Sequence, residues 1–303
     1  MRSPAIAIVI PTRNRRLLLE RAISSVLAQT LDDFELIIVD DGSTDGTEDY
    51  VLELRHPKIR YIAMREHVGA CRARNEGIAA STAPLVTFLD SDDVYLPDRL
   101  ARVVEEFHRS PHLDLFISSF RTVRRNRTTQ CSNPSVQLNR ADLEKGLVSH
   151  AIFIAGSAIT AHRRVLARVG AFDSTLQRMQ DRDLLLRLAR VTGARLSSRI
   201  DWTKYQSPDS ISADRHGYVE ALAELIARHP VFMEKYPDTT GYLLARHIFK
   251  ELLIPDPAGL RNALTLAKQY RYFDLGKARV IAAYVIGKRF RRSVRKDIAA
   301  HMR

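Results

Sequence analysis

Leu85–Asp93 reads LVTFLDSDD, an apolar run that changes at once into an acidic turn. The apolar part is typical of a buried strand, and a helix is predicted to follow at Pro97. Carboxylates are depleted within strands, so several of them at a strand's carboxyl end are expected to hold a cation or a polar ligand. Because the whole chain carries a net charge of +12, this acidic turn favours a divalent metal that presents a phosphorylated substrate. Aspartate and serine also form plain turns and helix caps, so the flanking sequence has to decide.

Alternating apolar runs and helix-period segments fill the first half of the chain. Repeated β-α-β units of this kind imply a mainly parallel sheet with right-handed crossovers, so the chain is predicted to be an α/β protein. Strands are predicted at 5–10, 36–39, 59–64, 85–89 and 115–119, and helices at 14–28, 69–80 and 97–107, with one more ending near residue 55.

Polar residues follow three predicted strands at the point where each strand ends. They are Pro11–Thr12, Asp40–Asp41 and the acidic turn Asp90–Asp93. Ligands of parallel sheets bind where the loops leave the carboxyl ends of the strands. We therefore expect these three loops to meet at one crevice.

The second half of the chain becomes wholly helical beyond about residue 215. The predicted organisation is a catalytic domain over 1–215 and a helical region over 216–303, which could also serve as a homodimer interface. The individual predictions are a loop or hairpin near the acceptor side at 120–150, a strand at 152–161, and helices at 182–191, 217–229, 238–253, 257–271 and 274–298.

The composition is that of an ordinary globular protein. With 303 residues, 45% of them hydrophobic and 27% charged, the chain can form one large or two modest domains. Its two cysteines, Cys71 and Cys131, are too few for a disulfide framework and are interpreted as free thiols of a reducing compartment. The N-terminal apolar run is too short for a signal peptide, and no window approaches the roughly 20 apolar residues of a membrane span. We expect a cytoplasmic protein, or one that is peripheral on the inner face of the membrane.

Residues 287–303 contain seven basic residues and one acidic residue. Phe290, Val294 and Ile298 recur among them at helical spacing, which predicts a basic amphipathic helix. A solvated helix end and a peripheral contact with an anionic membrane both explain this pattern. No nucleic-acid-binding motif accompanies the charge, so nucleic acid is not expected as a partner.

The sequence contains neither of the common glycine-rich phosphate loops. The first predicted strand runs into Pro11–Asn14 without G-x-G-x-x-G, and G-x-x-x-x-G-K-[ST] is absent, which excludes dinucleotide-binding dehydrogenases and P-loop enzymes. A nucleotide diphosphate would then need a metal and side chains. Asp90 and Asp92 fit this need, because Mg²⁺ takes one or two protein carboxylates together with phosphate oxygens, and Mn²⁺ accepts the same oxygen ligands.

Each of the other polar residues has two possible interpretations. Asp40 and Asp41 could accept hydrogen bonds from a base or a ribose, or could form the turn before Gly42. Arg74 could reach the same crevice or face solvent. Asp181 precedes a predicted amphipathic helix, where it could be the N-cap or, beside an acceptor, a general base that removes a hydroxyl proton.

Six blocks of the sequence resemble, in order and spacing, the family 2 glycosyltransferases. They are Ile6–Asn14 (IAIVIPTRN), Phe34–Gly46 (FELIIVDDGSTDG), Gly69–Gly77 (GACRARNEG), Phe88–Asp93 (FLDSDD), Gly170–Asp173 (GAFD) and Gln180–Leu188 (QDRDLLLRL). The resemblance covers about residues 5–215. It implies a GT-A fold, that is, a Rossmann-like, mainly parallel sheet flanked by helices. It also implies a nucleotide-sugar donor, a divalent cation and inversion at the anomeric carbon.

The resemblance assigns the donor side residue by residue. Pro11 and Thr12 resemble the backbone wall of the family's nucleotide site. Asp41 is similar to the acid that contacts the base, with Asp40 beside it. Arg74 resembles the arginine on the donor side.

The resemblance also assigns the reacting side. Asp90 and Ser91 match the ribose and phosphate contacts, Asp92 matches the metal ligand, and Asp181 resembles the catalytic base. The family usually has glutamate before that base, whereas this chain has the neutral Gln180. The Q-x-x-R-W signature of processive polysaccharide synthases is missing, which favours the addition of one or a few sugars.

The predicted function is that of a metal-dependent, non-processive inverting glycosyltransferase of the hexosyltransferase type. It would use Mg²⁺ or Mn²⁺ and move a sugar from a nucleotide diphosphate donor, with UDP-sugars favoured, to a hydroxyl of a glycan or lipid-linked acceptor. A nucleotidyltransferase acting on a sugar phosphate remains an alternative, and it would release pyrophosphate. A non-catalytic nucleotide-sugar-binding protein on the same scaffold remains another, because of Gln180.

Overall fold

The computed structural model describes residues 3–124, 127–206 and 218–252, together with Arg261, Thr265 and Val294. Its strands are β1 Ile6–Thr12, β2 Phe34–Asp40, β3 Ile59–Ala63, β4 Leu85–Phe88, β5 Val94–Tyr95, β6 Leu115–Arg124, β7 Arg127–Cys131, β8 Val136–Leu138, β9 Ile159–His162 and β10 Ala194–Tyr205. Its helices are α1 Arg16–Leu27, α2 Thr47–Glu53, α3 Ala70–Ala80, α4 Arg99–Arg109, α5 Arg140–Val148, α6 Arg163–Arg168, α7 Gln180–Ala189, α8 Tyr218–Arg228, α9 Val231–Glu234 and α10 Pro237–Leu252, with a 3₁₀ turn at Gly156–Ala158.

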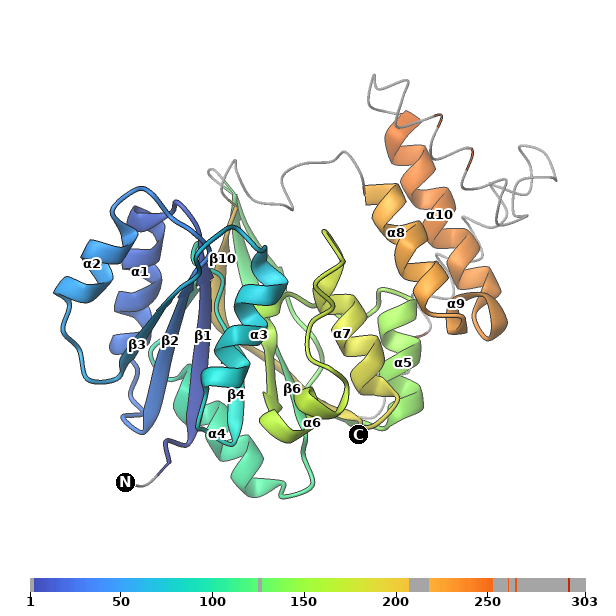
Figure 1. The fold of residues 1–303 in the computed structure, drawn as a ribbon. Coiled ribbons are helices and arrows are strands. Elements are labelled where there is room, and N and C mark those ends of the chain that lie inside the picture. Colours follow the sequence, from blue (N-terminus) through green and yellow to red (C-terminus); the bar gives the residue numbers. More distant parts are fainter. Residues whose placement is uncertain are drawn as a thin grey trace.

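The strands form a single sheet in the order β3-β2-β1-β4-β9-β6-β10-β5, with β7 beside β6 and β8 beside β10. Parallel pairing joins β3, β2, β1 and β4, and also joins β6 to β10. Between these two groups, β9 runs antiparallel to both β4 and β6. Figure 1 shows the sheet flanked by helices, with α8, α9 and α10 grouped beyond α5 and α7. The predicted α/β fold is confirmed, with antiparallel β9 inserted into a mainly parallel sheet.

The central strands are buried along their whole length. All seven residues of β1 and all four of β4 are buried. Strands covered by helices on both faces need apolar side chains on both faces, which explains why these runs are continuous rather than alternating.

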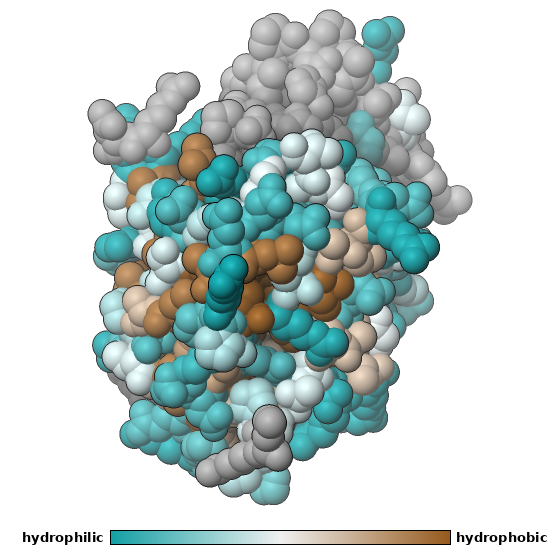
Figure 2. All heavy atoms as spheres, turned by 60° about the vertical axis from the view of Figure 1, so that its left-hand side comes forward, coloured by the Kyte–Doolittle hydropathy of each residue, from teal (hydrophilic) through white to brown (hydrophobic). Residues whose placement is uncertain are grey.

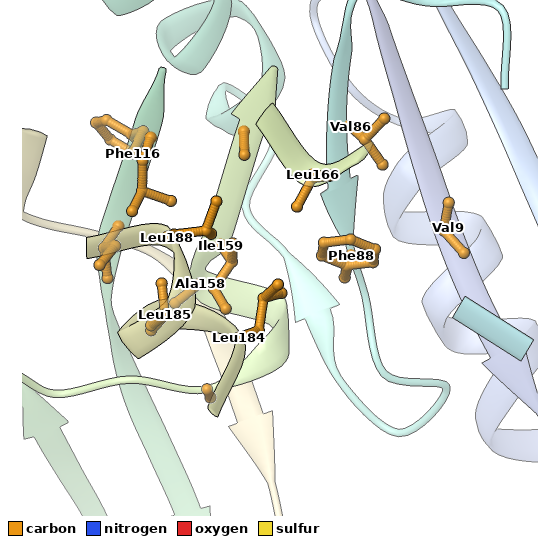
Figure 3. Close-up of a cluster of buried hydrophobic side chains, with 14 of the residues drawn as sticks. Val9, Val86, Phe88, Phe116, Ala158, Ile159, Leu166, Leu184, Leu185 and Leu188 are labelled. Atoms are coloured by element: carbon orange, nitrogen blue, oxygen red, sulfur yellow. The ribbon is translucent and has the colours of Figure 1, made fainter. Parts of the chain in front are cut away.

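Three leucines fix α7 against the sheet. Leu184, Leu185 and Leu188 are fully buried and recur at helical spacing. Figure 3 shows them among side chains of the neighbouring strands, close to Ala158 and Ile159. This packing holds the first turn of α7, which lies one turn before these leucines.

A buried ion pair ties α4 to β10. Arg99 donates to Asp201 at 2.6 Å, and both side chains are fully buried. Arg99 also donates to the Ser118 hydroxyl and the Ser157 carbonyl, both at 2.8 Å, and lies over the ring of Tyr95. A charge without water is stable only when it is paired and hydrogen-bonded, and this network meets most of that need. Arg99 Nε and Asp201 Oδ2 have no hydrogen-bond partner within the described residues.

Two helix starts differ from the sequence predictions. Asn14 does not cap α1: its φ is 49°, its side chain accepts from the Thr44 N–H at 2.7 Å, and the helix begins at Arg16. The helix predicted from Pro97 begins at Arg99. Asn14 therefore joins two loops instead of starting helix α1.

The region after β6 departs further from the predictions. The hairpin predicted within 120–150 is present as β6 and β7, but α5, capped by the Asn139 side chain, and strand β8 were not predicted. The strand predicted at 152–161 forms only from Ile159, because Gly156 and Ser157 form a 3₁₀ turn. β10 was also missed, since its charged and polar residues hide the strand pattern.

The face shown in Figure 2 is mostly hydrophilic. Figure 2 shows one face on which apolar residues gather in the middle and hydrophilic residues surround them. Leu17 and Leu52 are the large hydrophobic residues exposed within the described part of the chain. Among the same residues, no helix combines the length and hydrophobicity that crossing a bilayer requires.

Candidate functional site

The carboxyl ends of β2, β1 and β4 lie next to one another at one edge of the sheet. Thr12 pairs with Asp40 in the parallel register, and Val9 pairs with Phe88. The N–H of Asp41 donates to the Thr12 carbonyl at 2.8 Å. The three polar loops predicted from the sequence therefore leave adjacent strands.

The ends of β1 and β2 are buried, and their side chains differ in hydrogen bonding. Pro11 and Thr12 are both buried, and the Thr12 hydroxyl has no hydrogen-bond partner within the described residues. Both carboxylate oxygens of Asp40 are hydrogen-bonded, because Oδ1 accepts from the Ser43 N–H at 2.8 Å and Oδ2 accepts from the Tyr61 hydroxyl at 2.7 Å. Thr12 thus keeps an open hydrogen-bonding group, whereas the Asp40 side chain shapes the turn.

Asp41 holds the loop that leads into α3. It accepts from the N–H groups of Val68 and Gly69, at 2.6 and 2.9 Å, and contacts Nδ1 of His67 at 2.7 Å. A carboxylate offers about four lone-pair positions, so one stays available for an N–H of a ligand. Asp41 therefore links the end of β2 to the helix that carries Arg74.

The acidic turn after β4 presents its carboxylates unequally. The side chains of Asp90 and Asp92 are 25% and 9% exposed, whereas Asp93 is fully buried. Asp93 accepts from the Ser157 hydroxyl at 2.7 Å and from the Tyr205 N–H at 3.2 Å. Burial raises the pKa of Asp93 well above its usual range, and the charges of Asp90 and Asp92 add to the rise. Asp93 anchors the turn, while Asp90 and Asp92 remain within reach of a ligand.

The carboxylates of this turn fit a hard divalent cation. One oxygen each from Asp90, Asp92 and Asp93 lies within 4.8 Å of the others. Mg²⁺ binds oxygen at about 2.1 Å, so ligands on opposite sides of the ion lie roughly 4.2 Å apart, which small side-chain movements would achieve here. Ser91, within the turn, is buried at 3% exposure.

Arginines already pair with this turn. Arg74 donates to Oδ1 of Asp90 at 2.7 Å, and Arg15 donates to Oδ2 of Asp92 at 3.3 Å. Arg21 donates to the main-chain carbonyl of Asp92 at 2.9 Å. Any metal ion that binds Asp92 must therefore share it with Arg15 or displace that arginine.

Asp181 lies in the first turn of α7. The helix begins at Gln180 and its N-cap is Met179, with a φ of 59°, so the alternative that Asp181 caps the helix is wrong. Burial raises the pKa of Asp181, and the charge of Asp90 adds to the rise while Arg74 opposes it. A carboxylate with a raised pKa is suited to accept a proton during a reaction.

Gly156 lies where these side chains meet. A Cβ placed on Gly156 would be 3.3 Å from Oδ1 of Asp181 and 3.6 Å from both Arg74 Nη2 and Asp90 Oδ1. The next residue, Ser157, accepts from the N–H of Asp90 at 3.1 Å. The structure thus brings Asp181, Arg74 and Asp90, which come from three separate segments, around one backbone turn.

Gln180 binds the second terminal nitrogen of Arg74, Nη1, whereas Asp90 binds Nη2. Its Oε1 accepts from Arg74 Nη1 at 3.1 Å, while its Nε2 donates to the carbonyls of Leu176 and Gln177 at 3.0 and 3.2 Å. A neutral amide therefore holds the arginine without adding a charge beside Asp181.

Cys71 is a buried free thiol near this site. Burial raises the pKa of its thiol to about 12, although the positive charge of Arg74 opposes the rise. At neutral pH the thiol is protonated and is not a nucleophile. This agrees with its interpretation as a small hydrophobic residue.

Several residues of the site were not predicted, among them Gly156, Ser157, Arg15, Arg21 and Lys204, which lies near the end of β10 beside the acidic turn. The Gly156–Ser157 pair within an apolar run was the available signal for a turn. Arg15 and Lys204 gave no comparable signal. The basic segment 287–303 lies outside the described residues, except for Val294, so its helix and its membrane contact remain predictions.

Comparison with known sequences gives one family. The model of Glycosyl transferase family 2 matches residues 7–169. An uncharacterised glycosyltransferase of Nostoc sp. (strain PCC 7120) is 37% identical over 177 residues, which cover 55% of this chain and 54% of that protein. The putative colanic acid biosynthesis glycosyl transferase WcaA of Escherichia coli (strain K12) is 43% identical over 101 residues, or 33% of this chain and 36% of that protein. The matched part thus spans about half, or less, of the length of these curated relatives.

Comparison with solved structures gives the same architecture. Residues 1–349 of Staphylococcus aureus TarS, in complex with UDP, superpose with a TM-score of 0.65 at 17% identity, covering 97% of this chain and 89% of that one. The mannosyltransferase PcManGT of Pyrobaculum calidifontis, in complex with GDP-Man and Mn²⁺, superposes with a TM-score of 0.58 at 21% identity, covering 95% and 88%. These likenesses confirm the GT-A-like α/β fold expected from the sequence.

Proposed function

The chain belongs to glycosyl transferase family 2, and from this premise we propose that it transfers a sugar from a nucleotide diphosphate donor to a hydroxyl group, with inversion at the anomeric carbon. The observation that carries the proposal is the meeting of Asp181, Arg74 and Asp90 around Gly156. In this proposal Asp181 is the base, Arg74 is the cation and Asp90 belongs to the acidic turn, and all three act on one sugar.

The nucleotide lies along the ends of β1 and β2 in this proposal. Pro11 and Thr12 form its wall, and the unpartnered Thr12 hydroxyl supports a hydrogen bond to the ligand. Asp41 accepts from the base with its remaining lone pair, and Asp40 holds the turn that presents it. UDP-sugars remain the favoured donors. GDP-sugars belong in the same test, because the structural relatives hold UDP and GDP-Man.

The diphosphate and sugar lie over the acidic turn. Asp90 and Ser91 contact the ribose and the phosphates, and Arg74 holds Asp90 in place. Asp92 would hold a Mg²⁺ or Mn²⁺ ion, and when bound that ion neutralises charge on the nucleotide diphosphate. The hard oxygen donors of the turn and the Mn²⁺ named with PcManGT support this assignment.

Asp181 acts as the general base. The acceptor oxygen attacks the anomeric carbon, and its proton passes to a carboxylate oxygen of Asp181. The bond from the anomeric carbon to the diphosphate oxygen breaks, and its electron pair leaves with the nucleoside diphosphate. One such displacement inverts the anomeric configuration. The raised pKa of Asp181 supports the role, because a stronger base takes the proton more readily.

The acceptor is proposed to be a hydroxyl of a glycan or of a lipid-linked glycan in polysaccharide biosynthesis. The name of the relative WcaA, which refers to colanic acid biosynthesis, supports this choice. The missing signature of processive synthases supports the addition of one sugar or a few.

Product analysis tests this function. The full chain is incubated with UDP- and GDP-sugars, Mn²⁺ and glycan acceptors, and the nucleotide products are separated. We expect nucleoside diphosphate, with the rate reduced about 10²–10⁴-fold by Asp181→Asn and unchanged by Asp49→Asn on the exposed face of α2. In a parallel incubation with nucleoside triphosphates and sugar phosphates, release of pyrophosphate would instead establish a nucleotidyltransferase. Donor binding without turnover, equal in the parent and in Asp181→Asn, would establish a binding protein.

A further inference from the structure

Lys204 lies at the end of β10, beside the acidic turn. Its neighbour Thr203 pairs with Val94, directly after that turn. Its other neighbour, Tyr205, donates its N–H to Asp93 at 3.2 Å. Both neighbours thus hold the backbone of Lys204 against the turn, and its side chain is only partly exposed.

The ammonium group of Lys204 lies within the field of the acidic turn and of Asp181. Burial lowers the pKa of Lys204, but the carboxylates more than offset this effect, so its pKa is raised and the group stays charged. The carboxylates that raise it are Asp93, Asp90, Asp181 and Asp92.

Lys204 differs from the two arginines of the site. Arg74 and Arg15 make direct contacts with single carboxylates, Asp90 at 2.7 Å and Asp92 at 3.3 Å. Within the described residues, Lys204 makes no ion pair shorter than 4 Å and is shared among the carboxylates at longer range. A flexible ammonium that is not committed to one carboxylate is free to turn towards a phosphate.

We propose that Lys204 binds the donor's diphosphate and, in the absence of donor, opposes metal binding, so that the two ligands bind cooperatively. This inference rests on the proposed function and adds a residue and a binding order to it. The place of Lys204 carries it, because the pairing of Thr203 with Val94 and the hydrogen bond from the Tyr205 N–H to Asp93 hold the backbone of Lys204 against the acidic turn.

The physical reason is a balance of charge. Without a nucleotide, the ammonium of Lys204 neutralises part of the acidic turn and repels a divalent ion. When a diphosphate arrives, its oxygens attract both the ammonium and the metal, and the repulsion is offset. Coupling of this kind is reciprocal, so the metal must raise nucleotide affinity by the same factor by which the nucleotide raises metal affinity.

Calorimetric titrations with Mn²⁺, UDP and GDP test this coupling on the full chain. Lys204→Met keeps most of the side-chain volume and removes the charge, and Lys204→Arg keeps the charge. Lys204→Gln supplies a second neutral side chain if the methionine variant fails to fold. Lys58→Met is the matched control, because Lys58 pairs with Asp32 away from the acidic turn.

The expected result is that the affinities for metal and for nucleotide change in opposite directions. Lys204→Met should bind Mn²⁺ alone about tenfold more tightly, and UDP or GDP about tenfold more weakly in the presence of Mn²⁺, within the usual range of coupling between sites. Lys204→Arg and Lys58→Met should stay close to the parent.

Two outcomes would overturn the inference while leaving the proposed function intact. One is a parent that binds UDP or GDP with Mn²⁺ and a Lys204→Met variant with the same affinities. The other is a neutral variant in which the affinities for metal and nucleotide fall together, as loss of a merely structural lysine would cause. A parent that binds neither nucleotide would instead count against the proposed function itself.

Discussion

Gly156 shows how much of the site depends on a single missing side chain. Its Cα faces the point where Asp181, Arg74 and Asp90 come together. A β-carbon there would be 3.3 Å from Oδ1 of Asp181, closer than ordinary van der Waals contact. The space is therefore reserved either for these side chains or for the substrate they bind.

The variant Gly156→Ala tests whether the space beside Gly156 must stay unfilled. Its extra methyl group should displace the base or the donor and reduce kcat/KM at least about tenfold, since small misplacements at a reacting centre are costly. Gly156 has a φ that other residues tolerate, so the melting temperature should change by only a few degrees. Parallel measurements of kcat/KM and of thermal unfolding decide the matter, and an alanine variant as active as the parent would show that the space is not used.

The pH profile should report the environment of Asp181. A general base works only when deprotonated, and burial raises the pKa of this carboxyl above the ordinary aspartate value of 3.8. Activity should therefore be lost as the pH falls through a value above 3.8. The measurement is kcat/KM against pH for the parent and for Gln180→Glu. The added carboxylate should move the acid limb to higher pH, because a like charge raises a neighbouring pKa. An acid limb at the ordinary aspartate value would contradict the assignment.

The sequence supplied most of the residues of the site but not their relations. Asp92 and Asp181 stand in recognisable blocks, so their positions could be predicted. Lys204 and Arg15 could not, because their importance comes from distances that only the folded chain sets. Whether Asp181 caps its helix also needed coordinates, since the residue that precedes the helix is Met179.

At the scale of elements, a buried network joins α7 to α8. Asp183 contacts Nε2 of His229 at 2.9 Å and accepts from Arg187 at 2.9 and 2.7 Å. Burial opposes ionisation of Asp183, yet these partners lower its pKa. Helix α7 is thus held from two sides, by its leucines against the sheet and by this network against the end of α8.

Removing His229 should weaken that connection. His229→Ala leaves one oxygen of a buried carboxylate without its partner and should lower the free energy of unfolding by about 1–3 kcal/mol. Urea denaturation measures the loss, and His108→Ala on the exposed face of α4 is the control. Because the pKa of Asp183 is lowered in the fold, its stabilisation is present above the unfolded value of 3.8 and is lost as the pH falls through the lower folded value. Equal stability of the two histidine variants would show that α8 does not support α7.

Elements with a clear apolar period could be predicted and others could not. The central strands were found because both of their faces are buried. β10 was not found, because the polar residues at 197–199 interrupt its alternation of apolar and polar residues, at the point where its register with β6 also shifts. The strand at 152–161 was predicted too long, because Gly156 and Ser157 start a 3₁₀ turn inside an apolar run.

At the scale of the whole molecule, the predicted division near residue 215 falls in 207–217, outside the described residues. The contacts of His229 and Arg228 with the preceding part show that α8 packs onto it. We propose that the helical region serves the acceptor side, where a lipid-linked glycan would approach.

Membrane binding through 287–303 can be measured by liposome flotation. The full chain should float with vesicles that contain anionic lipid and should remain below with neutral vesicles. Binding should weaken as the salt concentration rises, because salt screens the attraction between the basic residues and the anionic lipid. Each basic residue near the surface contributes about 1 kcal/mol to this attraction. A chain ending at residue 286 is the comparison, with circular dichroism to establish that it is folded. Equal flotation of the two chains would remove the proposal.

The proposed transfer requires one site that holds a nucleotide diphosphate through a metal at the acidic turn. The most direct measurement is a thermal-shift screen of UDP, GDP and their sugars with and without Mn²⁺, on the parent and on Asp92→Asn. Ligands that bind only the folded state raise its melting temperature. We expect one nucleotide to raise it in the presence of Mn²⁺, and we expect Asp92→Asn to lose that metal-dependent shift. A rise in melting temperature that is the same without Mn²⁺ and in Asp92→Asn would contradict the proposed metal-dependent site. No rise with any nucleotide would contradict it as well.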